Sequence, residues 1–144
     1  MKKIGIYKHF DIYSCDTVAN SPIVAPFLKA LADLIQLGQA EPNIINVNNH
    51  PAIFLQENEK IVGFTVYTVI KDSRILWKFL TFVDPEYRQQ GIGAKLNSVI
   101  DDVARLKDCI KVQSHVHVNN TSMIACNEAS GMIQQFIKFN KDLI

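Results

Sequence analysis

One short segment, Arg88 to Gly93, holds residue types that together could bind an anion. The basic side chain of Arg88 precedes the glycines Gly91 and Gly93, and an apolar helical periodicity begins at the same place. The first N–H groups of a helix have no intrahelical acceptor and carry the positive end of its dipole. Glycines leave the main chain uncovered, so a diphosphate could approach it. The segment therefore predicts a phosphate-binding turn at the start of a helix.

Two other glycine-rich phosphate loops do not fit this segment. The P-loop spacing G-x-x-x-x-G-K-[ST] is absent. A dinucleotide fingerprint needs a third glycine where this chain has Leu96, and it follows a βαβ unit rather than a meander. The remaining alternative is an ordinary strand-to-helix loop that ends in a glycine cap.

A strand and a helix must position the turn. The β-branched and aromatic run from Ile75 to Val83 predicts a strand that ends at Asp84-Pro85. Apolar residues at helical spacing predict a helix from Gly91 to Lys107, namely Ile92, Leu96, Val99, Ile100, Val103 and Leu106.

The rest of the chain completes one mixed α+β domain over residues 1–144. Upstream we expect a strand at Ile4–Tyr7, a loop at Lys8–Ser21 and a helix that starts near Pro26 and stops at Gly38. A turn at Asn46–Pro51 should follow, and then two further strands of an antiparallel meander, Ala52–Gln56 and Ile61–Ile70. One face of the first helix should be apolar, with Phe27, Leu28, Leu31, Leu34 and Ile35. Downstream we expect a strand, a helix stopped by Gly131 and a last strand: Ile110–Val118, Thr121–Ser130 and Met132–Phe139.

Composition narrows the classes of function. The chain of 144 residues has a formal net charge of +1, and its basic residues are scattered, which argues against nucleic acid as a partner. No apolar run approaches the length of a membrane span. Cys15, Cys109 and Cys126 have neither disulfide-framework nor zinc-ribbon spacing, and no metal site is expected. We therefore expect a cytoplasmic protein.

The run Phe82 to Gly93 matches R-x-x-G-x-[GA] and resembles the GNAT superfamily of acetyl-CoA-dependent N-acetyltransferases. The similarity extends from Ile61 to Met132, through the strand that precedes Asn119-Asn120, the next helix and Gly131-Met132. It implies a GNAT-like fold with a mixed, mainly antiparallel sheet flanked by helices. Against the family pattern the chain is short at the C-terminus, because two strands usually follow the Gly-Phe pair.

The resemblance implies acetyl-CoA as cosubstrate and assigns residues to it. The strand backbone at Phe82 and Val83 would pair with the pantetheine arm. The pyrophosphate would meet the N–H groups of the turn, with Arg88 nearby, and Asn120 would contact the coenzyme, unless it only caps the helix. The turn residues so assigned are Gln89, Gln90, Gly91, Ile92, Gly93 and Ala94.

The chain departs from the family at the residues that move protons. Where many members have a tyrosine near the departing sulfur, this chain has Asn127, which is expected to lie beside the coenzyme but cannot protonate a thiolate. Where some have a glutamate early in the strand, it has Trp77. A base five residues before the Asn, as in the ribosomal-protein alanine branch, maps onto His115, so His115 is our predicted general base and His117 the second choice. Alternation along the predicted strand would place both histidines on the same face. Either could instead be a half-buried or solvent-facing strand histidine.

The acceptor follows less directly. We expect a primary amine, with a small molecule favoured over a peptide or protein N-terminus, and direct attack in a ternary complex. The first alternative is a non-catalytic acyl-CoA-binding or regulatory module, and the second is a structural domain without a ligand. An unpaired strand edge near the C-terminus would also allow a homodimer.

Overall fold

The computed structural model of the chain describes residues 1–39 and 49–144. Its strands are β1 (Lys2–Tyr7), β2 (Phe10–Cys15), β3 (Ala52–Glu57), β4 (Lys60–Ile70), β5 (Ile75–Val83) and β6 (Lys111–Ser114). Its α-helices are α1 (Val24–Gln36), α2 (Ile92–Leu106) and α3 (Thr121–Ala129), and short 3-10 turns form η1 (Val18–Asn20) and η3 (Pro85–Tyr87). No helix among these is long and apolar enough to cross a membrane.

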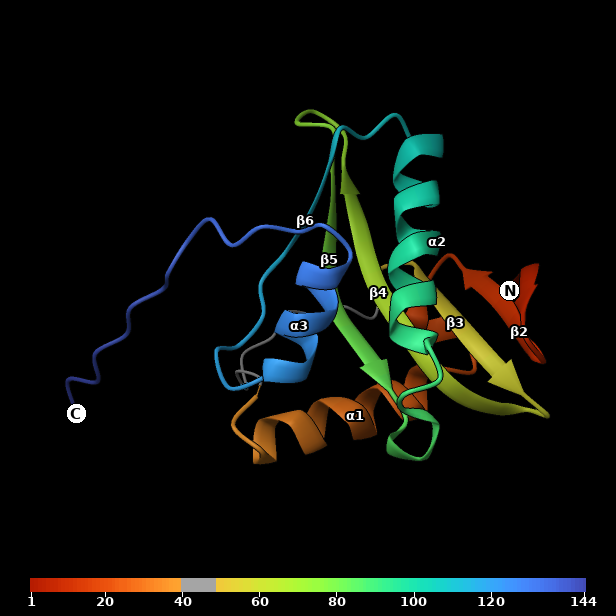
Figure 1. Ribbon diagram of the computed structural model, residues 1–144, viewed down its shortest axis with the longest axis horizontal. Helices are drawn as coiled ribbons and strands as arrows, with labels where there is room; N and C mark the ends of the chain where they lie inside the picture. Colours follow the sequence, from red (N-terminus) through yellow and green to blue (C-terminus); the bar gives the residue numbers. More distant parts are fainter. Residues whose placement is uncertain (40–48) are drawn as a thin grey trace.

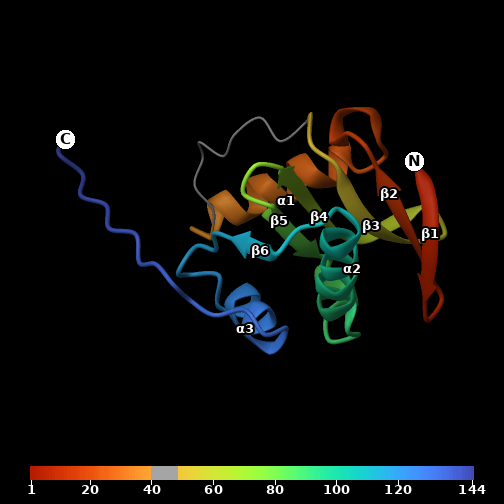
Figure 2. The same cartoon turned by 90° about the horizontal axis from the view of Figure 1, so that it is seen from above.

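The six strands form one sheet in the order β1 to β6. Every neighbouring pair is antiparallel except β5 and β6, which are parallel. Figures 1 and 2 show α1 on one face of the sheet and α2 with α3 on the other. The predicted mixed, mainly antiparallel sheet flanked by helices is confirmed.

Each face of the sheet has its own apolar core. The α2 face buries Ile92, Leu96 and Ile100 against Leu55 and Leu76. The α1 face buries Phe27, Phe54 and Phe64 among other residues, Ile23 included. Burial of large side chains on both faces makes β3 and β4 the apolar centre of the domain, which explains their nearly continuous burial.

Strand β5 changes its register at Phe79. Leu80 pairs with Val66 and Lys78 with Tyr67, so Phe79 lies opposite no residue of β4 and forms a bulge. Strand β6 pairs with β5 only from Ile75 to Lys78. The far edge of residues 79–83 therefore has no strand partner among the described residues.

Several element predictions are confirmed: β1, the β3–β4–β5 meander, α2 and α3, and the stop of α1 before Gly38, which adopts a positive φ of 68°. Residues 46–48 of the predicted turn lie outside the described part of the chain, and its last two residues, His50 and Pro51, precede β3.

Three predictions of elements are wrong. Residues 8–21 are not a loop, because Phe10–Cys15 forms β2, whose Phe10 and Ile12 are buried between β1 and β3. The strand predicted to reach Val118 ends at Ser114, where the parallel pairing with β5 stops. Residues 132–139 form no strand, since no sheet edge pairs with them, and Figure 1 shows them leading away from the sheet.

Two smaller corrections concern apolar faces. Leu28 was expected on the buried face of α1 but is exposed, and Ala30 takes its place beside Phe27 and Leu34. Leu106, the last residue of α2, is likewise exposed.

Candidate active site

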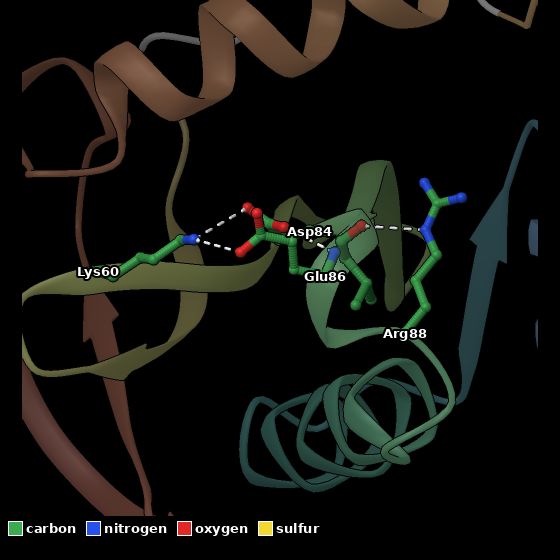
Figure 3. A network of polar contacts seen from close by, with 5 residues as sticks. Lys60, Asp84, Glu86 and Arg88 are labelled. Carbon is green, nitrogen blue, oxygen red and sulfur yellow. Dashed lines mark hydrogen bonds and ion pairs between the residues drawn. The ribbon is translucent and has the colours of Figure 1, made fainter.

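The turn between β5 and α2 is held by short-range polar contacts. Asp84 caps η3, because its Oδ1 accepts from the Glu86 N–H at 2.9 Å. Lys60 Nζ lies 3.2 Å from Glu86 and 3.9 Å from Asp84, which ties the turn to β4 (Figure 3). The hydrogen bond that Lys60 donates to the Glu86 carboxylate raises the pKa of Lys60. These contacts fix the exit of the chain from β5 ahead of the predicted phosphate turn.

The first hairpin also fixes this turn. The Gln90 carbonyl accepts from the Tyr7 hydroxyl at 3.1 Å and from Lys8 Nζ at 3.0 Å. Gln89 and Gly91 have positive φ angles of 62° and 79°, so the main chain makes a sharp left-handed turn on either side of Gln90. The sequence prediction missed these partners, because the β1–β2 connection lies over eighty residues earlier in the chain.

The start of α2 presents free donors. In the described part of the chain, the N–H groups of Ile92, Gly93 and Ala94 have no hydrogen-bond acceptor, and the first such bond runs from the Lys95 N–H to the Gly91 carbonyl at 2.9 Å. Ala94 and Gly91 are exposed, so solvent reaches the helix start. Free first-turn amides at an accessible helix start fit an anionic group such as a diphosphate.

At both glycine positions of the turn a larger residue would meet a neighbouring side chain, a steric requirement that the sequence did not reveal. A Cβ on Gly91 would lie 2.5 Å from the Tyr7 hydroxyl oxygen, and one on Gly93 would lie 3.2 Å from the Cys126 sulfur. Gly91 thus lets β1 reach the turn, and Gly93 lets α3 pack on the first turn of α2. The glycines therefore bring protein elements together, in addition to any role beside a ligand.

Arg88 is exposed and directly follows η3. Its Nε donates to the Val83 carbonyl at 3.3 Å, and Figure 3 shows the guanidinium on the opposite side of the turn from Lys60. The Val83 carbonyl is thus already engaged by Arg88. Phe82 directs its ring to the α1 face, where it lies 5.6 Å from the ring of Phe64. An arm along this edge would meet mainly the backbone between Phe79 and Phe82.

Asn120 is the N-cap of α3. Its Oδ1 accepts from the Met123 N–H at 3.4 Å. The capping alternative is therefore confirmed for this residue, and a contact with a coenzyme stays a prediction. Asn127 is buried inside the protein, with its Oδ1 facing Lys78.

The two candidate histidines lie beyond the end of β6. The alternation that was expected to place both on one strand face does not apply there, because pairing ends at Ser114. His115 is exposed and packs edge-on against Trp77 at 4.8 Å between ring centroids. His117 Nδ1 accepts from the Asn119 N–H at 3.1 Å, so its Nε2 is the nitrogen left to react.

A buried polar cluster formed by Lys78, Asn97, Asn127 and Cys126 was missed. Lys78 Nζ donates to Asn97 Oδ1 at 2.8 Å and to Asn127 Oδ1 at 2.9 Å, while Asn97 Nδ2 lies 3.5 Å from the Cys126 sulfur. Burial lowers the pKa of Lys78 to about 8. The one available signal was a lysine at the centre of the apolar run Ile75–Val83.

A third histidine near the end of the β5–β6 pairing, His50, was not considered as a candidate site residue in the sequence analysis. The ring of His50 lies 4.8 Å from that of Phe79, the bulged residue at the point where β5 and β6 part. Sequence reasoning had placed His50 in a turn. Across residues 1–39 and 49–144, no three His, Cys, Asp or Glu side chains are grouped to hold a metal ion.

Strands β5 and β6 diverge beside a helix whose first N–H groups have no acceptor, an arrangement that fits an extended anionic ligand. The sequence model of the acetyltransferase (GNAT) family matches residues 11–132, and the chain therefore belongs to the GNAT acetyltransferase family. The resemblance and the fold class predicted from the sequence are confirmed.

Relatives with known names support the same assignment. The chain is 30% identical over 87 residues to the [ribosomal protein bS18]-alanine N-acetyltransferase of Escherichia coli strain K12, a match that covers 60% of this chain. It spans 57% of the length of that protein.

Solved structures share the fold at lower identity. The ribosomal-protein-alanine N-acetyltransferase of Brucella melitensis biovar Abortus 2308 superposes with a TM-score of 0.71 at 15% identity, covering 93% of this chain and 99% of that one. The aminoglycoside acetyltransferase meta-AAC0020 from an uncultured soil metagenomic sample gives 0.69 at 17%, covering 94% and 97%. Aminoglycoside N-acetyltransferase AAC(6')-Iy in complex with CoA gives 0.67 at 16%, covering 98% and 99%.

Proposed function

We propose that this protein is an N-acetyltransferase that transfers the acetyl group of acetyl-CoA to a primary amine. The observation that carries the proposal is the continuity of β5, its turn and α2: an unpaired strand edge leads directly to the unsatisfied amides of Ile92, Gly93 and Ala94. Membership of the acetyltransferase family and the CoA-bound structural neighbour support it.

The parts of this site would act in order along the coenzyme. The amides at the start of α2, with the guanidinium of Arg88 nearby, bind the pyrophosphate. The main chain of Phe79 to Phe82 hydrogen-bonds the pantetheine amides as an added strand would. The thioester then lies where β6 joins β5, and the amine attacks its carbonyl carbon directly.

The general base we propose is His115, which is solvent-accessible and held by Trp77. A base need only take the ammonium proton of the acceptor, directly or through water. His115→Ala and His115→Gln should both lower the rate and change the pH–rate profile, and His117→Gln tests the second candidate in the same way. An unchanged rate and profile in the His115 variants would remove this residue from the mechanism and leave His117 as the next candidate, followed by His50.

The names of the similar proteins suggest two classes of acceptor amine for this enzyme. Some of the similar proteins are named aminoglycoside acetyltransferases, and others are named alanine N-acetyltransferases of a ribosomal protein. We propose a small-molecule amine and retain a peptide N-terminus as the alternative. A panel containing sisomicin and a peptide that begins with alanine, read by mass spectrometry for the gain of one acetyl group, separates the two. Coenzyme binding without turnover on any amine would indicate a regulatory module.

Binding of the coenzyme is tested by Ala94→Asp. A carboxylate at the exposed Ala94 would occupy the free amides and repel a pyrophosphate, while it favours the helix itself. We expect coenzyme A affinity to fall by about tenfold or more, with no loss of thermal stability. Ser98→Asp, exposed one turn further along α2, is the matched control and should bind nearly as the parent does. Equal affinities of parent and Ala94→Asp would contradict the proposed phosphate site.

A homodimer also belongs to this proposal. Apolar side chains after α3 are exposed, namely Ile133, Phe136, Ile137, Phe139, Leu143 and Ile144. Their exposure supports association with a second copy. A strictly monomeric profile in light scattering at high concentration would contradict it.

A further inference from the structure

Lys78 is the most deeply buried charged side chain beside the unpaired edge of β5. Its relative exposure is 2%, and it lies on the α2 face of the sheet. Its two amide partners come from different helices, Asn97 from α2 and Asn127 from α3. Neither amide carries a charge, so the ammonium is solvated but not neutralised by its direct partners.

The ammonium group of Lys78 also has one N–H donor without an acceptor among the described residues. A protonated lysine has three N–H donors, and the described residues supply acceptors for two of them. The titratable groups around Lys78 are Cys126 on α3 and Asp101 on α2, which both oppose the effect of burial, and Tyr67 opposite it on β4. A buried ammonium with an unfilled donor favours a site for a transient negative charge.

The place of Lys78 along the strand matches the end of an extended arm. Five residues, Phe79 to Val83, separate it from the turn, and at about 3.3 Å per residue they span about 17 Å. An arm that starts at the amides of α2 and follows the unpaired edge is stopped where Lys78 and Ser114 pair. The reacting sulfur of the proposed cosubstrate would therefore arrive beside Lys78.

Resting on the proposed acetyltransferase function, we propose that Lys78 is the catalytic acid that protonates the departing thiolate of coenzyme A. The amine nitrogen forms a bond to the thioester carbon, and the carbon–sulfur bond breaks with its electron pair on sulfur. Lys78 Nζ gives one proton to that sulfur and becomes neutral. The amine proton goes to the general base, and solvent reprotonates Lys78 after coenzyme A leaves.

The buried cluster around Lys78 holds the protonated side chain in the way that this role requires. Asn97 and Asn127 hold the ammonium by their oxygens, which fixes its direction. Its pKa of about 8 leaves it mostly protonated at neutral pH and able to donate. Asn127, which cannot itself donate a proton to sulfur, acts as a positioning residue that holds the acid.

The test compares coenzyme A with desulfo-coenzyme A on the parent, Lys78→Met and the control Lys111→Met. Lys111 is an exposed lysine of β6. The ultraviolet absorbance of the thiolate reports the ionisation of the bound coenzyme across neutral to alkaline pH. An ammonium beside the sulfur should leave the parent and Lys111→Met with at least about tenfold more bound thiolate than Lys78→Met.

A second measurement needs no variant. In protein labelled with ¹³C at lysine Cε, the Lys78 resonance should titrate at higher pH with coenzyme A bound, and should not change in this way with desulfo-coenzyme A. Equal thiolate fractions in folded parent and Lys78→Met, or an identical Lys78 titration with both ligands, would overturn the proposal. Failure of the parent to bind either ligand would instead refute the acetyltransferase function itself.

Discussion

Replacing Lys78 by methionine should change how the stability of the protein depends on pH. Methionine has similar volume and no charge, so it removes the buried titration while it retains most of the packing. Below about pH 8 the lysine is protonated in both the folded and the unfolded chain. Between about 8 and the ordinary value of 10.5, the unfolded chain holds a proton that the folded chain has released. The free energy of unfolding of the parent therefore gains a contribution that rises with pH in this window.

The size of that contribution follows from the two pKa values. The gap between about 8 and 10.5, at about 1.4 kcal/mol per pH unit, corresponds to about 3.5 kcal/mol. Lys78→Met lacks this gain, so the stability of the parent relative to the variant should increase progressively between about pH 8 and pH 10.5. The absolute order of the two at neutral pH also depends on the amide oxygens that methionine leaves without a donor.

Urea unfolding followed by circular dichroism, repeated across this pH range, measures the difference directly. Lys111→Met controls for the loss of one lysine, and because its side chain is exposed its stability should run parallel to that of the parent. If the parent and Lys78→Met differ by a constant amount at every pH, Lys78 is not the depressed buried ammonium described above.

Two further substitutions test the loop and the helix around the site. Gly91→Ala places a Cβ at a φ of 79° and 2.5 Å from the Tyr7 hydroxyl oxygen, so the free energy of unfolding should fall by about 1–3 kcal/mol in urea titrations. The control is Gly5→Ala, whose Cβ would contact Ile12 at an ordinary 3.7 Å. An equal loss of stability in both variants would refute the steric explanation. Asn120→Ala removes the acceptor of the Met123 N–H and should cost about 1 kcal/mol, which Asn120→Asp restores. A loss of coenzyme A affinity in Asn120→Ala beyond this destabilisation would add the predicted coenzyme contact to the cap.

Local patterns in the sequence were sufficient for the meander and for the position of the turn between β5 and α2. The run Ile75–Val83 and the periodicity of α2 each determine one element, and the turn lies between them, so its position follows from its neighbours. Strand β2 was missed because its charged residue Asp11 reads as loop. In the structure Asp11 forms an ion pair at 2.9 Å with Lys3 on β1, across a hairpin that the polar composition of residues 8–21 did not reveal.

The buried cluster could not be predicted in the same way. Lys78 is stabilised by residues 19 and 49 positions further along the chain, on two helices whose packing depends on the sheet. The histidines illustrate the converse. Alternation in a strand was extended to His115 and His117, but the strand ends where its parallel partner ends, so their directions follow from loop geometry.

The bulge at Phe79 links these features. In a regular strand Lys78 would share a face with Leu80 and Phe82, which pack in the α1-side core. The extra residue shifts the alternation, so that Lys78 shares the α2 face with Thr81, whose hydroxyl meets that of Thr65 at 3.0 Å. On that face the Lys78 ammonium donates hydrogen bonds to the amide oxygens of Asn97 and Asn127, whereas on the α1 face it would meet phenylalanine rings. The same bulge lies where β6 stops pairing, and bulges commonly end pairing and redirect side chains. One irregular residue thus marks the start of the unpaired strand edge and also turns Lys78 toward the α2 face at the point where that edge ends.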